Sequence, residues 1–133
     1  MRFQPKFYIM QTISTSSAPA AIGPYSQGII SGGLLFTAGQ IPLDPKEMSL
    51  VGIAIEEQTL QVLRNLDAVL AAAETSWDRV VKTTVFLTDL ADFPAMNRIY
   101  EKHLGGAKPA RSTVQVAALP RGAKIEIEIV AEI

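Results

Sequence analysis

The chain ends in the stretch KIEIEIVAEI, from Lys124 to Ile133, in which apolar and charged side chains alternate. Successive side chains of a β-strand point to opposite faces of the sheet, so this alternation predicts a strand with one buried face. We expect the apolar set on the buried face and the charged set on the other, namely Ile125, Ile127 and Ile129 against Glu126 and Glu128. Such a strand needs a neighbouring strand beside it and helices over its apolar face.

The preceding segment, Arg111 to Ala117, alternates in the same way, and the turn sequence Leu119-Pro120-Arg121-Gly122 separates the two. So short a connection predicts that the two strands pair directly and antiparallel. On this interpretation one face of the pair is apolar and lies under the helices, whereas the other is polar. The polar face would hold Arg111, Thr113, Gln115, Glu126 and Glu128.

Two segments have the apolar spacing of amphipathic helices. The first runs from about Ile55 to Ala73. The second follows Asp89 or Asp92, either of which can cap a helix, and ends at Gly105. Its expected buried face consists of Phe93, Met96, Tyr100 and Leu104.

Two further regions predict strands. Val80 to Thr88 is rich in β-branched residues, and Ile29–Ile30 and Leu34–Thr37 flank the turn Ser31-Gly32-Gly33 of a hairpin. Together the elements predict a single α+β domain with a mainly antiparallel sheet and two helices packed on one face. Two helices cover only one side of such a sheet. The other side is either solvated or packed against copies of the same chain.

The composition excludes several classes of function. The 133 residues carry a net charge of −1, whereas nucleic-acid-binding proteins usually carry a basic stripe. The absence of cysteine excludes disulfides, a thiol nucleophile and a cysteine-based zinc site, and it favours a cytoplasmic location. No apolar run approaches the roughly 20 residues of a membrane-spanning helix, so no membrane partner is expected. The single histidine, His103, disfavours a Ser-His-Asp triad or a two-histidine metal site and is expected near a helix end.

Residues 1–9 are interpreted as a short N-terminal extension. Their sequence, MRFQPKFYI, lacks the apolar region of a signal peptide. Met10 is a candidate start, and the expected domain spans residues 10–133.

The stretch IGPYSQG, from Ile22 to Gly28, places an aromatic side chain in a polar loop. Gly23-Pro24 indicates a turn, because proline fixes its own φ and biases the preceding residue away from helix. Tyr25 therefore either pins this loop onto the domain or belongs to a functional site. The residues themselves leave both interpretations open.

Five stretches follow one another in a specific order. They are APAAIGPYSQG (Ala18–Gly28), FTAGQIP (Phe36–Pro42), VVKTTVFLTDLADFPAMNRIY (Val80–Tyr100), PARSTVQVAALP (Pro109–Pro120) and KIEIEIVA (Lys124–Ala131). Together they resemble the signature blocks of the Rid family, the YjgF-type reactive intermediate deaminases, and most closely its RidA-like branch. The resemblance extends from about Met10 to the C-terminus.

This resemblance implies a chorismate-mutase-like fold that assembles as a homotrimer, with the sheets as an inner barrel and three clefts between subunits. It implies hydrolysis of 2-imino acids and their enamine tautomers, such as 2-aminoacrylate, to 2-keto acids and ammonia without a cofactor. These intermediates are released by pyridoxal-phosphate-dependent dehydratases. The chain is thus expected to be a 2-iminobutanoate/2-iminopropanoate deaminase.

The resemblance also implies site residues. The catalytic positions are Arg111, Glu126 and Tyr25, and the substrate-binding positions are Arg111, Gly39, Asn97, Thr113 and Ala38. Arg111 would grip the substrate carboxylate, and Glu126, expected to lie near it and therefore to be ionised, would hold the water. Tyr25 would cover the cleft. Ala38 and Thr113 stand where serine and cysteine are frequent in the family, which affects substrate preference more than reaction type.

Two other classes of function stay open. A trimer that binds small ligands without turnover, or acts as a chaperone, would use the same cleft. A ribonuclease or translation inhibitor is less favoured, because the chain has near-zero net charge, one histidine and no aromatic stacking platform.

Overall fold

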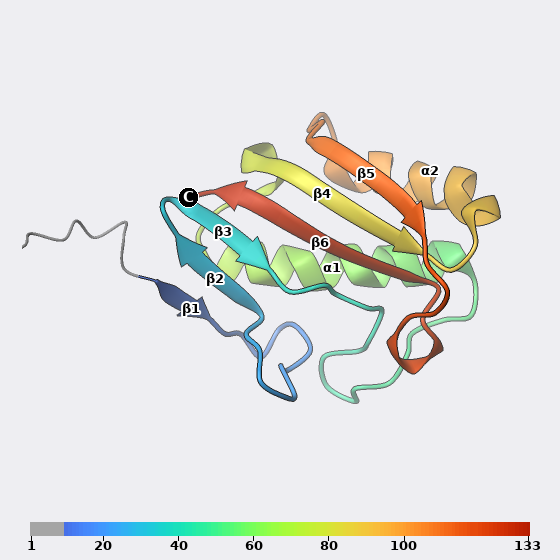
Figure 1. Cartoon of the computed structure of the whole chain (residues 1–133), viewed down its shortest axis with the longest axis horizontal. Coiled ribbons are helices and arrows are strands. Elements are labelled where there is room, and N and C mark those ends of the chain that lie inside the picture. Colours follow the sequence, from blue (N-terminus) through green and yellow to red (C-terminus); the bar gives the residue numbers. More distant parts are fainter. Residues whose placement is uncertain (1–9) are drawn as a thin grey trace, which may run out of the picture.

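The computed structural model describes residues 10–133, so the expected extension at residues 1–9 lies outside the described part of the chain. The strands form one six-stranded sheet. Figure 1 shows both helices against one face of this sheet, which confirms the predicted α+β class. The strands are β1 (Gln11–Ile13), β2 (Gly28–Ser31), β3 (Leu34–Thr37), β4 (Val80–Leu87), β5 (Ala110–Gln115) and β6 (Ile125–Glu132). The helices are α1 (Ile55–Ala72) and α2 (Phe93–Leu104), with short 3₁₀ turns η2 (Trp77–Arg79), η3 (Leu90–Asp92) and η4 (Pro120–Gly122).

The strands lie across the sheet in the order β1-β2-β3-β6-β4-β5. β4 pairs in parallel with β5 and antiparallel with β6, so it separates them. The predicted direct pairing of the last two strands is therefore wrong. The reason is α2, which carries the chain back from the end of β4 to the start of β5, because such a crossover produces a parallel pair. β6 then fills the space between β4 and β3.

The register assigns β5 to the faces differently from the prediction. Arg111 lies opposite Thr83, and Thr113 lies opposite Val85. Thr83 and Val85 are fully buried on the helix side, and partners in register share a face. Arg111 and Thr113 therefore face α2 rather than the open side of the sheet. Alternation did not reveal this, because the edge strand β5 has no fully buried side chain on either face.

For β6 the prediction is confirmed. Its isoleucines are at most 2% exposed and lie in the core beneath the helices. Glu126 pairs with Phe86 and Glu128 with Thr84 on the opposite face. The charged residues of this strand therefore lie on the side of the sheet that the helices leave open.

Both helices are confirmed close to their expected bounds. At the start of α1, the Glu57 carboxylate accepts a hydrogen bond of 3.3 Å from the backbone N–H of Ala54, which satisfies a donor that has no partner within the helix. At the end of α2, Gly105 adopts a φ of +64°, a conformation that favours glycine. The expected face of α2 is buried at Met96, Tyr100 and Leu104.

The predicted hairpin is confirmed, and one strand before it was missed. Gly32 and Gly33 have φ values of +61° and +78°, as a tight turn between β2 and β3 requires. β1 pairs with β2 but was not predicted, because its three residues QTI carry a single apolar side chain. β1 extends the sheet beyond the hairpin and brings the following loop next to it.

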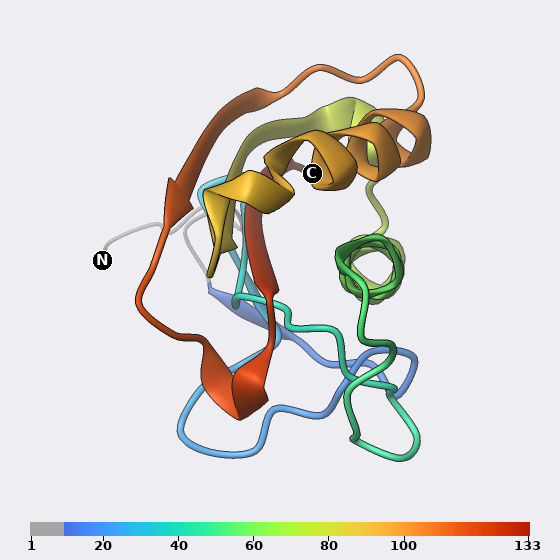
Figure 2. The same ribbon diagram turned by 90° about the vertical axis from the view of Figure 1, so that its right-hand side faces the viewer.

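Among residues 10–133, no helix covers one face of the sheet. Figure 2 shows α1 and α2 on the same side of the strands. On the open side, Phe36 and Val114 are 45% and 41% exposed. Neither helix among the described residues combines the length and apolar character that crossing a membrane requires.

Candidate functional site

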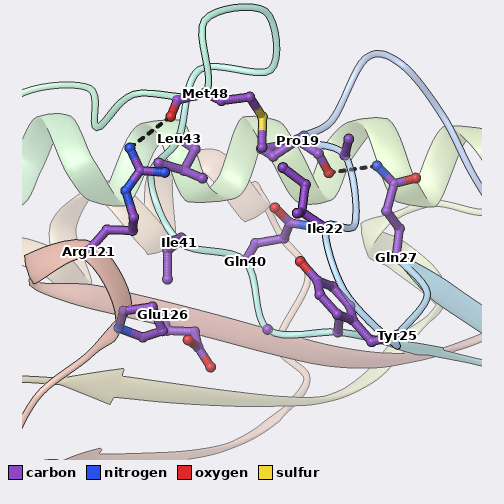
Figure 3. Close-up of a pocket in the computed structure, with 14 residues that line it drawn as sticks. Pro19, Ile22, Tyr25, Gln27, Gln40, Ile41, Leu43, Met48, Arg121 and Glu126 are labelled. Carbon is purple, nitrogen blue, oxygen red and sulfur yellow. Dashed lines mark hydrogen bonds between the residues drawn. The ribbon is translucent and has the colours of Figure 1, made fainter.

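A cavity of about 560 Å³ brings four of the predicted site residues together (Figure 3). These residues are Tyr25, Ala38, Gly39 and Glu126, and we call the cavity the carboxylate pocket. Most of the remaining wall is apolar and comes from residues that the sequence did not single out, such as Ile22, Ile41, Leu43 and Met48. The pocket thus combines one carboxyl group and one phenol with a largely apolar surface.

Glu126 is the titratable group of this pocket. It is half-buried on β6, and this burial raises the pKa of its carboxyl above the ordinary 4.5, with a smaller contribution from the negative charge of Glu128. The expectation that a nearby Arg111 keeps Glu126 readily ionised is therefore wrong for the single chain. A carboxyl with a raised pKa is a better proton acceptor, and its protonated form is more accessible near neutral pH.

Gly39 lies directly against Glu126. Gln40 and Ile127 exchange backbone hydrogen bonds of 2.9 and 3.1 Å, which fix the segment after β3 beside β6. A Cβ atom on Gly39 would lie 2.7 Å from Cδ of Glu126. Only glycine therefore lets the backbone and the carboxyl group occupy their observed positions.

Tyr25 lies in a loop that a buried glutamine fixes in place. The Tyr25 side chain is 55% exposed. Tyr25 lies across the cavity from Glu126, and its phenol oxygen points into the cavity (Figure 3). Gln27 is 3% exposed and receives a hydrogen bond of 2.6 Å from the backbone N–H of Thr15, while its amide nitrogen donates to the carbonyl of Pro19 at 2.8 Å. Gln27 was not predicted from the sequence, in which its place in the IGPYSQG stretch is the one available signal.

The rim of the pocket carries a second residue that sequence analysis treated only as part of a turn. Arg121 of η4 has a φ of +63°, and its Nη2 donates a hydrogen bond of 2.9 Å to the carbonyl oxygen of Met48. Met48 itself has a φ of +57°. This contact joins the loop between β3 and α1 to the turn that precedes β6.

Arg111 and Asn97 form a separate site on the other side of the sheet. Nη1 of Arg111 donates a hydrogen bond of 2.7 Å to Oδ1 of Asn97 on α2. Both residues line a depression of about 460 Å³, together with Glu101 and Lys108, and we call it the arginine pocket. This contact fixes the guanidinium relative to α2, and the role of Asn97 in substrate binding stays a prediction.

Thr113 lies two residues from Arg111 on the same face of β5. Among residues 10–133 its hydroxyl oxygen is buried and has no hydrogen-bond partner. A buried hydroxyl without a partner costs free energy, and Thr113 lines neither the carboxylate pocket nor the arginine pocket, so its role in substrate binding stays a prediction.

Arg111 and Glu126 do not meet within one chain. They are on strands separated by β4, with Arg111 opposite Thr83 and Glu126 opposite Phe86, and these β4 side chains point to opposite faces. The expectation that the two residues share one face is therefore wrong. A single chain holds two separate pockets, the carboxylate pocket and the arginine pocket, which we refer to as its candidate half-sites.

His103 belongs to neither half-site. Its Nε2 lies 2.9 and 3.0 Å from the two carboxylate oxygens of Asp67, so the histidine joins α2 to α1. The indole N–H of Trp77 donates to the same carboxylate at 2.6 Å. Within residues 10–133, no group of three or more His, Cys, Asp and Glu residues has the arrangement of a metal site.

Comparisons with known proteins identify the family. The model of the family described as Endoribonuclease L-PSP matches residues 15–133. The 2-iminobutanoate/2-iminopropanoate deaminase of Mus musculus is 47% identical over 123 residues, which cover 92% of this chain and 91% of the mouse protein.

Two solved structures show the same fold. The Rid-family protein YyfA of Yersinia pestis is 49% identical, with a TM-score of 0.92 over 94% of this chain and 100% of its own. The structure of TdcF from E. coli with bound serine is 40% identical, with a TM-score of 0.88 over 92% of this chain and 98% of its own. This chain therefore belongs to the Endoribonuclease L-PSP family, to which the YjgF and Rid proteins also belong.

Proposed function

We propose that this protein is a deaminase that hydrolyses 2-imino acids and their enamine tautomers to 2-keto acids and ammonia. Within that class we assign it as a 2-iminobutanoate/2-iminopropanoate deaminase. The observation that carries the proposal is the carboxyl group of Glu126, half-buried in a cavity with Tyr25 and with a raised pKa. The mouse relative named for this activity, 47% identical, supports the same assignment.

The active site of this proposal is formed between subunits of a homotrimer. Arg111 and Glu126 face different sides of one chain, so a substrate that needs both must lie between two copies. Two features favour such an assembly: β5 is an edge strand with one unpaired side, and the sheet face without helices exposes Phe36 and Val114. In the trimer the arginine pocket of one subunit would close the carboxylate pocket of the next.

Substrate binding in this site would depend on Arg111. A 2-imino acid carries a carboxylate next to its electrophilic C=N carbon, and a guanidinium binds a carboxylate through two parallel hydrogen bonds. One N–H of Arg111 is used by Asn97, which leaves other donors for the substrate. The backbone N–H of Gly39 would add a contact, and Ala38 would leave space beside it. Thr113, two residues from Arg111 on the same face of β5, would shape the arginine side of the cleft.

Glu126 would then carry out the proton transfers. Its carboxylate accepts a proton from a water molecule as the water oxygen bonds to C2 of the protonated imine, which gives a tetrahedral carbinolamine. The carboxyl group returns that proton to the amino group. As the C–N bond breaks, the hydroxyl group gives its proton to the carboxylate of Glu126 and becomes the carbonyl of the 2-keto acid, and the departing ammonia takes up this proton and leaves as ammonium. The raised pKa that burial gives Glu126 in the single chain suits a group that must both accept and donate a proton in one cycle. In the assembled cleft the substrate carboxylate would pair with the neighbouring Arg111 and limit the opposing effect of that cation. Tyr25 would cover the cleft and donate its phenol hydrogen to substrate or water.

The chain would need no metal or organic cofactor for this reaction, because a protonated imine already accepts water. Positioning and one proton-transfer group then account for most of the acceleration. A cytoplasmic location and the absence of nucleic-acid or membrane partners, expected from the composition, belong to the same proposal.

The test is a coupled assay in which a serine or threonine dehydratase generates the imine and the release of keto acid is timed. We expect the protein to accelerate this release, Glu126→Gln to abolish the acceleration, and Glu132→Gln to retain it, because Glu132 is exposed on the same strand outside the pocket. Binding of 2-ketobutyrate without acceleration by the unmodified protein would instead show a ligand-binding trimer and overturn the proposal.

A further inference from the structure

Arg111 contacts three side chains that project from one face of α2. Besides the hydrogen bond to Asn97, its guanidinium carbon lies 5.2 Å from the ring centroid of Phe93 and 4.8 Å from that of Tyr100. Phe93, Asn97 and Tyr100 are spaced four and three residues apart, so they form a single stripe along the helix. Sequence analysis treated Phe93 and Tyr100 only as core residues of α2.

The ring of Tyr100 is itself held by the neighbouring strand. Tyr100 is 7% exposed, and its hydroxyl lies 2.8 Å from Oγ1 of Thr83, which is fully buried in β4. Thr83 is also the residue opposite Arg111 in the pairing of β4 with β5. The strand that positions the Arg111 backbone therefore also fixes the ring under its guanidinium.

We propose that Phe93 and Tyr100 are positioning residues that hold the guanidinium of Arg111 in the orientation in which it binds the carboxylate of the substrate. This inference rests on the proposed function, in which Arg111 makes that contact. Phe93 and Tyr100 touch only the arginine side chain in this role, so they are not catalytic residues.

The physical argument is preorganisation. An arginine side chain on an exposed edge strand loses rotamer freedom when it binds a ligand, and that loss weakens binding. Aromatic faces attract a guanidinium, and the attraction leaves its in-plane N–H groups free for hydrogen bonds. Because two rings and one amide contact Arg111, its side chain is already ordered before the substrate arrives. The conformational entropy of this side chain is therefore lost when the chain folds and not when the substrate binds.

The contacts predict a specific effect of ring removal. Phe93→Leu keeps an apolar side chain of similar reach and removes one ring, whereas Phe93→Tyr keeps the ring. Cation–π contacts change affinity by roughly three- to tenfold at partly exposed sites. Phe93→Leu should therefore weaken binding of the carboxylate by this factor and raise KM by a similar factor, with kcat changed less. Phe93→Tyr should restore wild-type values.

Three measurements on the full-length protein test the inference. Calorimetry gives the affinity for 2-ketobutyrate, steady-state kinetics separate KM from kcat, and NMR of the Arg111 Nε–Hε group reports the order of its side chain. Phe93→Leu and Tyr100→Leu are compared with Phe93→Tyr. Ile99→Val serves as the control for lost packing, since Ile99 is a half-buried residue of α2 that packs on the core.

We expect both leucine variants to lose order at Arg111 Nε and to bind 2-ketobutyrate more weakly, while Ile99→Val matches the wild type. If Tyr100→Leu fails to fold, Phe93→Leu alone decides, because Phe93 is only partly buried. Wild-type order and affinity in Phe93→Leu would overturn the inference. If the unmodified protein does not bind 2-ketobutyrate, the proposed function fails. The inference about Phe93 and Tyr100 fails with it only if the NMR signal of Arg111 Nε–Hε is also unchanged in Phe93→Leu and Tyr100→Leu.

Discussion

Gly39 contacts the side chain of Glu126 so closely that a methyl group has no room between them: a Cβ on Gly39 would lie 2.7 Å from Cδ and 3.0 Å from Cγ of the glutamate. Each residue thus sets the position of the other. The glutamate side chain ends in rotatable bonds, whereas the backbone at residue 39 is held beside β6 through Gln40. If a methyl group is introduced, the carboxyl group moves rather than the strand.

Gly39→Ala should therefore lower turnover with little effect on folding. The added methyl displaces the carboxyl group from its place in the pocket, and a displacement of about 1 Å in a reacting group can reduce the rate by roughly a hundredfold. The measurement is kcat in the coupled imine assay, with thermal unfolding alongside. Gly106→Ala is the matched control, because a Cβ at Gly106 meets no neighbouring atom within 4 Å among the described residues. Equal turnover in the two variants would contradict the assignment of Glu126.

The raised pKa of Glu126 in the single chain predicts how the stability of the unassembled chain depends on pH. Folding of this chain favours the protonated carboxyl, so the contribution of Glu126 to stability is fully present below the ordinary value of 4.5 and is lost as the pH rises through the raised pKa. Glu126→Gln should therefore raise the melting temperature of the unassembled chain at pH 7, and the difference should vanish as the pH falls toward 4.5. Thermal unfolding from pH 4 to 8, at a concentration at which the chains are not assembled, measures it. A lower melting temperature for Glu126→Gln at pH 7 would show that the carboxylate is favoured by the fold.

Substitutions at Arg111 separate its charge from its shape. Arg111→Lys keeps the charge and loses the planar pair of donors, and Arg111→Ala loses both. Since a charge-assisted hydrogen bond contributes roughly 1.5–3 kcal/mol, Arg111→Ala should lower kcat/KM by on the order of a hundredfold or more, and Arg111→Lys should lie between it and the wild type. Arg98, exposed on α2, gives the control Arg98→Lys. Wild-type kcat/KM in Arg111→Ala would remove the carboxylate contact from the mechanism.

A site shared between subunits predicts complementation. Arg111→Ala and Glu126→Gln should each be nearly inactive alone, yet subunits unfolded together and refolded should regain activity. With random mixing of equal amounts, about a quarter of the clefts combine an intact arginine from one variant with an intact glutamate from the other. The measurement is activity after refolding, with each variant refolded alone as the control. No recovery in a mixed oligomer would place both residues of one site in the same chain.

Removal of residues 1–9 should leave turnover and oligomeric state unchanged, because the family match covers residues 15–133 and both half-sites lie within residues 10–133. Sedimentation and the coupled assay on the shortened chain measure this outcome. A large loss of activity would show that the segment contributes to the site.

The sequence predicted the parts of the fold that depend on local periodicity. The isoleucines of β6, the apolar face of α1 and the paired glycines of the hairpin each produce a pattern within a few residues, and all three were confirmed. β5 shows the limit of such patterns. The neighbouring strand of β5 and the face of β5 that is covered are set by α2 and β4. Because β5 is an edge strand with half-buried residues, its sequence pattern reveals neither of them.

The candidate site was predicted in its residues but not in its arrangement. The resemblance selected Tyr25, Gly39 and Glu126, which line one cavity, and Asn97 and Arg111, which form a hydrogen bond. It did not indicate that these two groups lie on different sides of the sheet. Gln27 was missed for a different reason: its importance comes from the backbone groups of a distant loop that its amide satisfies, and no spacing in the sequence marks those groups.

On the proposed mechanism, the position of β4 between Arg111 and Glu126 would make activity a collective property of the chains in solution. If each cleft needs an arginine from one chain and a glutamate from another, the activity per chain follows the law of mass action and falls on dilution below the dissociation constant of the assembly. A newly made chain would be folded but inactive until it assembled with other copies. At concentrations near the dissociation constant, total activity in the cell would then rise more than in proportion to the amount of protein made.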